Sequence, residues 1–160
     1  MSAFSAARQI LNAVNLSTPL GLGLARATCR SIRRGPDGLF FAEGYRAPLP
    51  HAAAFTVGNV ILIRRDAAFV ADNPALLAHE ARHSSQYAAC LGLPFLPAYA
   101  VCAVWSLWRT GDPGLRNFFE RDAGLAAGGY RENAVRRRGP RRRRTAGRRA
   151  GDLKPTRPGR

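Results

Sequence analysis

The stretch LLAHEARHSSQ, residues 76–86, decides how this chain is organised. It contains His79, Glu80 and His83 in the pattern HExxH. On a helix of 3.6 residues per turn, side chains four positions apart share one face, so both imidazoles can bind one metal ion. Zinc suits two imidazole ligands, and a catalytic zinc keeps one position open for water. Glu80 is rotated by about 100° from its helical neighbour and lies close enough to take the proton of that water.

The residues before the motif predict that it is helical. Asn73 and Pro74 form a good helix start, because proline is favoured in the first helical turn, and Leu76 and Leu77 supply an apolar flank. The alternative is a polar helix face that carries two of the chain's three histidines by accident. This spacing with Glu between the histidines arises by chance in roughly one chain in several hundred, so we favour a metal site.

Charge is distributed unevenly along the 160 residues, a length that suits one domain with a substantial core. Residues 131–160 hold 12 Arg and one Lys against Glu132 and Asp152, a net charge of +11. Residues 1–130 therefore carry the remaining +4 of the net charge of +15. The basic segment is poor in apolar residues and dense in Arg, Gly and Pro, which predicts disorder. We therefore expect a folded domain over residues 1–130 and a basic disordered tail over residues 131–160.

The predicted tail suggests a partner through its charge alone. Residues 136–149 contain nine Arg and no acidic residue. Such a segment attracts an anionic membrane surface or nucleic acid, and salt weakens the attraction steeply. No RNA-binding or DNA-binding fold motif accompanies it.

Three cysteines without a CxxC pair argue for a reducing compartment, and the N-terminus is not a good signal peptide, so we expect a cytoplasmic protein. Membrane association is the alternative, because residues 87–108 contain no charge. Gly92, Pro94 and Pro97 interrupt this run, and the remaining helical piece, residues 98–108, is too short to span a bilayer. A buried core helix is the favoured interpretation.

Periodicity and turn signals predict the remaining elements. An amphipathic helix is expected near the N-terminus, and residues 17–23, rich in Gly and Pro, should end it. Its apolar side would carry Phe4, Ile10, Leu11 and Val14. Residues 39–43 predict a strand, and two β-rich runs around Gly58 predict a hairpin. A later helix is expected over residues 115–127, and its core candidates are Leu115, Phe118, Phe119 and Leu125.

The runs AFTVGNVIL, residues 54–62, and LLAHEARHSSQ together resemble the short bacterial HExxHxxQ domains classed as zinc metallopeptidases, which are similar to gluzincins in plan. The resemblance implies an α+β fold: a minimal zincin-like domain with a small antiparallel β region, an HExxH helix and a following Glu-bearing helix. It also implies that residues 60–63 form an edge strand that can pair with an extended peptide. The chain departs from the pattern at Arg82, where zincin helices are usually uncharged, and at Gly124, where thermolysin-like proteins carry Asp.

A catalytic zinc needs a third protein ligand. The metzincin pattern is excluded, because Gln86 and Ala89 stand where its Gly and His should be. The gluzincin pattern takes Glu from a later helix, and Glu120 meets that requirement 37 residues after His83. Asp122 and His51 are the alternative third ligands. If Glu120 is not a ligand, we expect it to form a surface ion pair with an arginine of its own helix.

Several further side chains are candidates for supporting the metal ligands or contacting substrate. Gln86 lies three residues after His83 on the same face and could orient its imidazole. Asn117 is a second candidate. Tyr87, Tyr99 and Tyr130 are candidate oxyanion donors, with core packing favoured for Tyr99.

Together these observations predict a zinc-dependent metallopeptidase that hydrolyses peptide or protein substrates, with Glu80 as general base and Zn²⁺ as cofactor. One alternative is a zinc-binding domain with little or no catalysis, acting in protein interaction. Another is a binder of nucleic acid or anionic membrane that acts through the Arg-rich tail.

Overall fold

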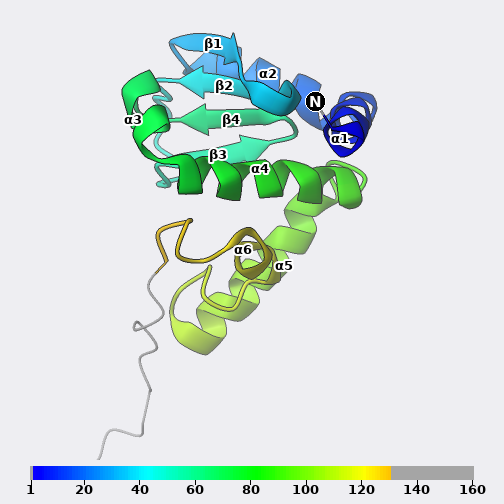
Figure 1. Ribbon diagram of the computed structural model, residues 1–160. Coiled ribbons are helices and arrows are strands. Elements are labelled where there is room, and N and C mark those ends of the chain that lie inside the picture. The colour runs from blue at the N-terminus through cyan, green and yellow to red at the C-terminus, as the bar shows by residue number, and fades with distance from the viewer. Residues whose placement is uncertain (1, 131–160) are drawn as a thin grey trace, which may run out of the picture.

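The computed structural model describes residues 2–130, which form a mixed α+β fold on one four-stranded sheet (Figure 1). The strands are β1 (Ser31–Arg34), β2 (Phe40–Glu43), β3 (Ala54–Val57) and β4 (Val60–Ile63). Their order is β1-β2-β4-β3, and β2 runs parallel to β4 while the other pairs are antiparallel. The predicted hairpin is confirmed as β3–β4, but the β region is mixed and not purely antiparallel.

Helices precede, connect and follow the strands. They are α1 (Ala3–Val14), α2 (Ser17–Thr28), α3 (Ala67–Asp72), α4 (Pro74–Ala89), α5 (Phe95–Thr110) and α6 (Phe118–Ala123), with a short 3-10 turn, η1 (Pro36–Gly38), between β1 and β2. Figure 1 shows α4 lying along the sheet beside β3, while α5 runs away from the sheet with α6 next to it.

Strand β4 is buried along its whole length because helices cover both of its faces. Val60 and Leu62 belong to one apolar cluster with α2, whereas Ile61 and Ile63 belong to a second cluster that packs against α3 and α4. A run of four apolar residues is typical of such a central strand. The expectation that residues 60–63 form an edge is therefore wrong, and β3 is the edge strand beside α4.

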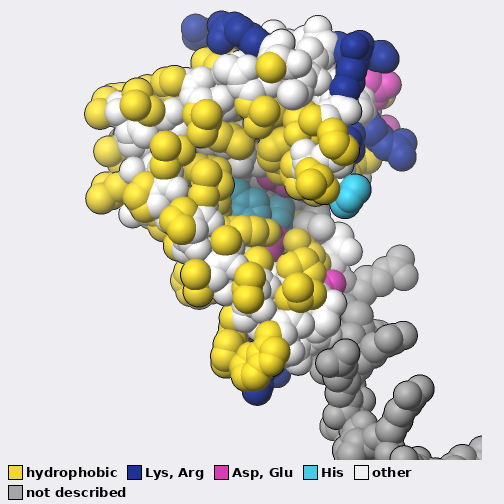
Figure 2. Space-filling view, turned by 180° about the vertical axis from the view of Figure 1, so that it is seen from behind, with side chains coloured by type: hydrophobic (Ala, Val, Ile, Leu, Met, Phe, Trp, Pro, Cys, Tyr) yellow, Lys and Arg dark blue, Asp and Glu magenta, His cyan; other side chains and the backbone are white. Residues whose placement is uncertain are grey.

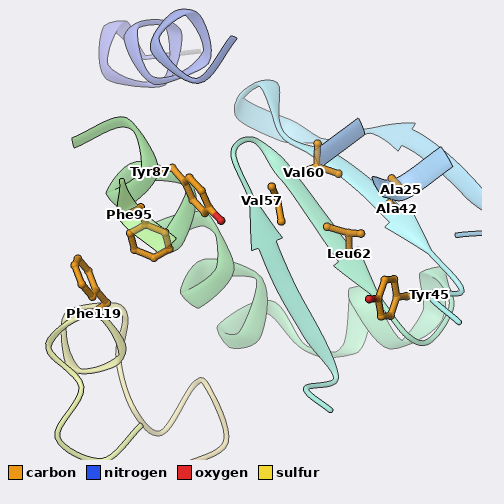
Figure 3. Packing of buried hydrophobic residues seen from close by; sticks show 9 residues of the cluster. All are labelled: Ala25, Ala42, Tyr45, Val57, Val60, Leu62, Tyr87, Phe95 and Phe119. Carbon is orange, nitrogen blue, oxygen red and sulfur yellow. The ribbon is translucent and has the colours of Figure 1, made fainter. Parts of the chain in front are cut away.

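Three aromatic rings extend the first cluster away from the sheet. Tyr87 of α4, Phe95 of α5 and Phe119 of α6 lie together in Figure 3. The ring centroids of Tyr87 and Phe95 are 4.4 Å apart, and those of Phe95 and Phe119 are 5.0 Å apart. Each such buried ring contributes about 1.5–3 kcal/mol to folding, so this cluster fixes α5 and α6 against α4.

Helix α1 exists as predicted, but its apolar side faces outward. Phe4, Ile10, Leu11 and Val14 are all exposed, and the buried residues are Ser5, Arg8 and Asn12. The inner face is polar because it supplies hydrogen bonds: the Asn12 amide donates to Asn59 Oδ1 and to the Ser84 carbonyl, both at 2.9 Å. The guanidinium of Arg8 donates to the Asp37 carbonyl.

Residues 17–23 do not form the expected break, because α2 begins at Ser17. Pro19 lies in the first helical turn, where a missing N–H costs no helical hydrogen bond. Gly21 allows α2 to approach the hairpin closely: a Cβ there would lie 2.4 Å from the Val57 carbonyl oxygen.

The two helices after α4 also differ from expectation. Helix α5 is not a buried core helix, since only Phe95, Ser106 and Thr110 of it are buried. Helix α6 is shorter than residues 115–127, and Phe118 is exposed, whereas Leu115 and Phe119 are buried as predicted and Leu125 is half-buried. The helix starts late because Asp112 ties the backbone of residues 114 and 115 into a turn.

Two further expectations concern a membrane-spanning helix and the basic tail. Within residues 2–130, no helix is both long enough and apolar enough to cross a bilayer. The predicted disordered tail, residues 131–160, lies outside the described residues.

Candidate metal centre

His79 and His83 lie on one face of α4, as the HExxH spacing predicts. Both side chains are buried, and their Nε2 atoms are 3.0 Å apart. Glu120 of α6 joins them: its Oε2 is 3.2 Å from Nε2 of His79, and its Oε1 is 3.6 Å from Nε2 of His83. The candidate ligand atoms of these three residues lie within 4.8 Å of one another, so the group could hold a metal ion.

Helix α6 is held in place on both sides of Glu120. Phe119 is buried in the aromatic cluster, and its carbonyl accepts a hydrogen bond of 3.0 Å from the Gln86 amide. Asp122 forms a two-pronged ion pair with Arg82 of α4, at 2.7 and 2.8 Å. Because Phe119 and Asp122 both contact α4, the Glu120 carboxylate between them is directed to the histidines.

Hydrogen bonds to the other ring nitrogen orient each imidazole. Nδ1 of His83 is 2.8 Å from Gln86 Oε1, and Nδ1 of His79 is 3.1 Å from the Gly124 carbonyl oxygen. Both partners are acceptors, so we assign the proton of each ring to Nδ1, which leaves the Nε2 lone pairs directed at the shared centre. The backbone of Gly124 thus supplies the acceptor for His79.

The carboxylate of Glu120 is only partly satisfied. Its Oε1 accepts a hydrogen bond of 2.5 Å from the Tyr99 hydroxyl, whereas the buried Oε2 lies 3.2 Å from Nε2 of His79 and makes no hydrogen bond within residues 2–130. Burial alone would raise the pKa of Glu120, but His79 and Tyr99 outweigh burial and lower it. Burial opposes charge on His79 as well, yet Glu120 and Glu80 raise the pKa of this imidazole. A positive charge at the centre is therefore favoured.

Glu80 lies beside this group without belonging to it. Its side chain is buried, and Oε2 accepts a hydrogen bond of 2.7 Å from the Thr56 hydroxyl of β3. Burial raises the pKa of Glu80, although His83 and Thr56 oppose the shift. The carboxylate is thus a better proton acceptor than a solvated one.

One cavity of about 390 Å³ is lined by the side chains of His79, Glu80, His83 and Glu120. Figure 2 shows histidine side chains at the floor of a hollow between apolar surfaces. One wall is the edge strand β3 with the loop before it, and the other comes from the start of α5 and from the segment after α6. The tyrosines Tyr87, Tyr99 and Tyr130 also line the cavity.

The other predicted site residues have distinct positions. Gln86 contacts His83 as expected and also bridges to α6. Asn117 is the N-cap of α6, where its Oδ1 accepts a hydrogen bond of 3.0 Å from the Phe119 N–H, so it positions the helix from the rear of the site. Tyr87 is fully buried, and burial raises its pKa; Tyr130 is half-buried, and burial raises its pKa to about 12.

The two alternative third ligands do not reach the centre. Asp122 points to Arg82 and Gln86, and His51 is exposed. Arg82 is occupied by Asp122 as well, so it does not offer a free site for a substrate carboxylate.

Sequence reasoning missed several contributors to the site. Thr56 stands 24 residues before its partner Glu80, and no sequence pattern connects them. Tyr99 packs against Phe95 and Phe119 as expected, but its hydrogen bond to Glu120 was not predicted. Gly128 lies against His79: a Cβ at this position would be 2.6 Å from Cε1 of the ring.

Comparison of the chain with protein-family models, with curated proteins and with solved structures finds no match.

Proposed function

We propose that this protein is a zinc-dependent peptidase with its catalytic centre at His79, His83 and Glu120. One observation carries the proposal. Two imidazole Nε2 lone pairs and a carboxylate oxygen that makes no hydrogen bond within residues 2–130, all buried, converge within 4.8 Å. Buried acceptors in this arrangement repel one another unless a cation or a proton lies between them. Two nitrogens and one oxygen form a donor set typical of catalytic zinc.

The residues of the chain have separate roles in this proposal. His79, His83 and Glu120 would hold the ion, and Gln86 and the Gly124 carbonyl fix the ring orientations. When bound, zinc supplies Lewis acidity that lowers the pKa of water and polarises a carbonyl.

Glu80 takes the proton of the attacking water at its carboxylate and later delivers it to the amine that leaves. The Thr56 hydroxyl holds this carboxylate in place. Tyr130 lines the same cavity and is the candidate donor to a developing oxyanion, because the single O–H of Tyr99 is donated to Glu120.

The edge strand supports a peptide as the substrate. Strand β3 is hydrogen-bonded to β4 on one side only, and its residues 54–57 line the cavity that contains Glu80. An open strand edge pairs with an extended chain through backbone hydrogen bonds, which would place a scissile carbonyl near the three ligands.

The experiment is a comparison of wild type, Glu80→Gln and Glu43→Gln for zinc content and for cleavage of a quenched fluorescent peptide library. The amide of Gln fits the space of Glu80 but cannot accept the water proton. We expect Glu80→Gln to retain zinc and lose at least 100-fold in cleavage rate. Glu43 pairs with Arg33 on the sheet, away from the cavity, so Glu43→Gln should behave as wild type.

Two results would contradict the proposal. Equal cleavage by wild type and Glu80→Gln would exclude Glu80 as the base. Stoichiometric zinc without cleavage in either protein would favour a zinc-binding domain that acts in protein interaction. Elemental analysis of wild type and His83→Ala checks the metal itself, since removal of one ligand should abolish tight binding.

A further inference from the structure

The second half of helix α5 buries two small polar residues and exposes most of its large apolar ones. The sequence of the helix, FLPAYAVCAVWSLWRT, contains no acidic residue, and two of its three buried residues are Ser106 and Thr110. Apart from Arg109, the large exposed side chains of the helix are apolar: Leu96, Val101, Val104, Trp105, Leu107 and Trp108. Val101, Val104 and Trp108 are 67–72% exposed. An apolar face of this kind marks an interaction surface.

The apolar surface continues past the start of the helix. Leu91 and Leu93, in the turn between α4 and α5, are exposed. Gly92 of this turn packs against Asn15 at the end of α1, where Val14 and Leu16 are exposed as well. Figure 2 shows apolar side chains from the upper part of the molecule to its lower tip, where α5 ends.

Charge indicates which partner this surface fits. The Arg109 guanidinium lies over the rings of Trp105 and Trp108, at 5.4 and 5.7 Å from their centroids. Tryptophan and arginine together are typical of the zone where acyl chains meet lipid headgroups. The sequence adds a net charge of +11 over residues 131–160.

We propose that the exposed face of α5 lies in the interface of an anionic lipid bilayer, with the helix axis along the membrane surface. A helix of 16 residues is too short to span the hydrocarbon core, but it suffices to lie in the interface. A second copy of this chain is a poorer occupant, because two strongly basic chains repel each other, whereas anionic lipid attracts them. This inference is independent of the peptidase proposal.

The test uses the full chain and its own fluorescence. Both tryptophans of the protein lie on α5, so their emission reports on this helix alone. We expect a blue shift when vesicles of 30% phosphatidylglycerol in phosphatidylcholine are added, and quenching when the acyl chains are brominated. Unchanged emission on vesicles that demonstrably bind the protein would overturn the proposal, since charge alone would then hold the chain at the surface.

A pair of variants separates apolar contact from charge. Val104→Gln combined with Trp108→Gln alters two exposed side chains and keeps every charge, and we expect vesicle affinity to fall at least tenfold. Leu49→Gln changes an equally exposed apolar residue outside α5 and should leave affinity unchanged. Equal affinity of the double variant and wild type would refute a role for α5. A wild-type dimer that the double variant converts to monomer, without any vesicle effect, would assign the face to a second copy.

Discussion

Gln86 offers a sharp test of the metal centre because it contacts a candidate ligand without being one. Its Oε1 accepts from His83 Nδ1 at 2.8 Å, and its amide donates to the Phe119 carbonyl and to Asp122 at 3.0 and 2.7 Å. Gln86→Leu keeps a similar volume but leaves the Nδ1–H of a buried imidazole without an acceptor. Loss of such a partner typically costs 10–100-fold in metal affinity, which corresponds to about 1.4–2.7 kcal/mol.

A second substitution at the same position separates ring orientation from helix packing. Gln86→Glu retains an acceptor for His83 but removes the donor to Phe119 and places a carboxylate beside Asp122. We expect this variant to keep zinc affinity within about threefold of wild type while its melting temperature falls, because the lost hydrogen bonds and the like charges destabilise the contact between α4 and α6.

The assay is competition for zinc against a chromogenic chelator at pH 7, with circular dichroism to confirm folding. Ser85→Ala is the matched control, because within residues 2–130 the Ser85 hydroxyl donates to the Ala81 carbonyl of its own helix and to no candidate ligand. A folded Gln86→Leu protein with wild-type zinc affinity would refute the argument that this side chain orients a ligand. Equal losses in Gln86→Leu and Gln86→Glu would refute the assignment of Oε1 as the relevant atom.

Two further predictions concern the support of the site. Arg82 and Gln86 lower the pKa of Asp122 to about 2, so this carboxylate stabilises the fold above its unfolded pKa of about 3.8, and the contribution disappears as pH falls through about 2. The ion pair between Arg82 and Asp122 is partly exposed, so solvent screening reduces its contribution to the free energy of unfolding to about 0.5–1 kcal/mol. Urea unfolding at pH 5 and at pH 2 should show the loss of this contribution in wild type but not in Asp122→Asn. Gly128→Ala should lower zinc affinity about tenfold, since its Cβ would displace the His79 ring, whereas Gly23→Ala, which meets nothing within 4 Å, should leave zinc affinity unchanged.

Local geometry explains why part of the site could be predicted from the sequence. The shared face of His79 and His83 depends only on helical periodicity, and α4 satisfies it. Glu120 was expected from a spacing pattern, and the tertiary contacts of its neighbours bring it to the histidines. That these residues bind zinc remains a prediction.

The remainder of the site depends on contacts between distant segments. The Gly124 carbonyl is a backbone group that every residue type carries, so no side-chain pattern identifies it as the acceptor for His79. Thr56 reaches Glu80 only because β3 is the edge strand beside α4, whereas the family resemblance implied that residues 60–63 form the edge.

Periodicity also shows that two faces of a helix differ without showing which face is inside. Helix α1 turns its polar side inward because Asn12 finds two buried acceptors there. Helix α5 does the same with Ser106, whose hydroxyl donates to the Asp112 carbonyl at 2.7 Å and accepts from the Arg116 N–H at 2.8 Å. In both helices, polar residues with buried hydrogen-bond partners lie inside, and several large apolar residues are exposed.

Helix α5 connects the metal centre to the proposed membrane face. On its inner side, Tyr99 holds the carboxylate of Glu120, and Phe95 packs against α4 and α6. On its outer side, Val104 and Trp108 are free of these contacts and face solvent. Leu96 belongs to both regions, because it is exposed and lines the cavity of the metal centre. A bilayer against α5 would therefore lie next to the cavity, so peptides held at a membrane surface would be the substrates nearest to Glu80.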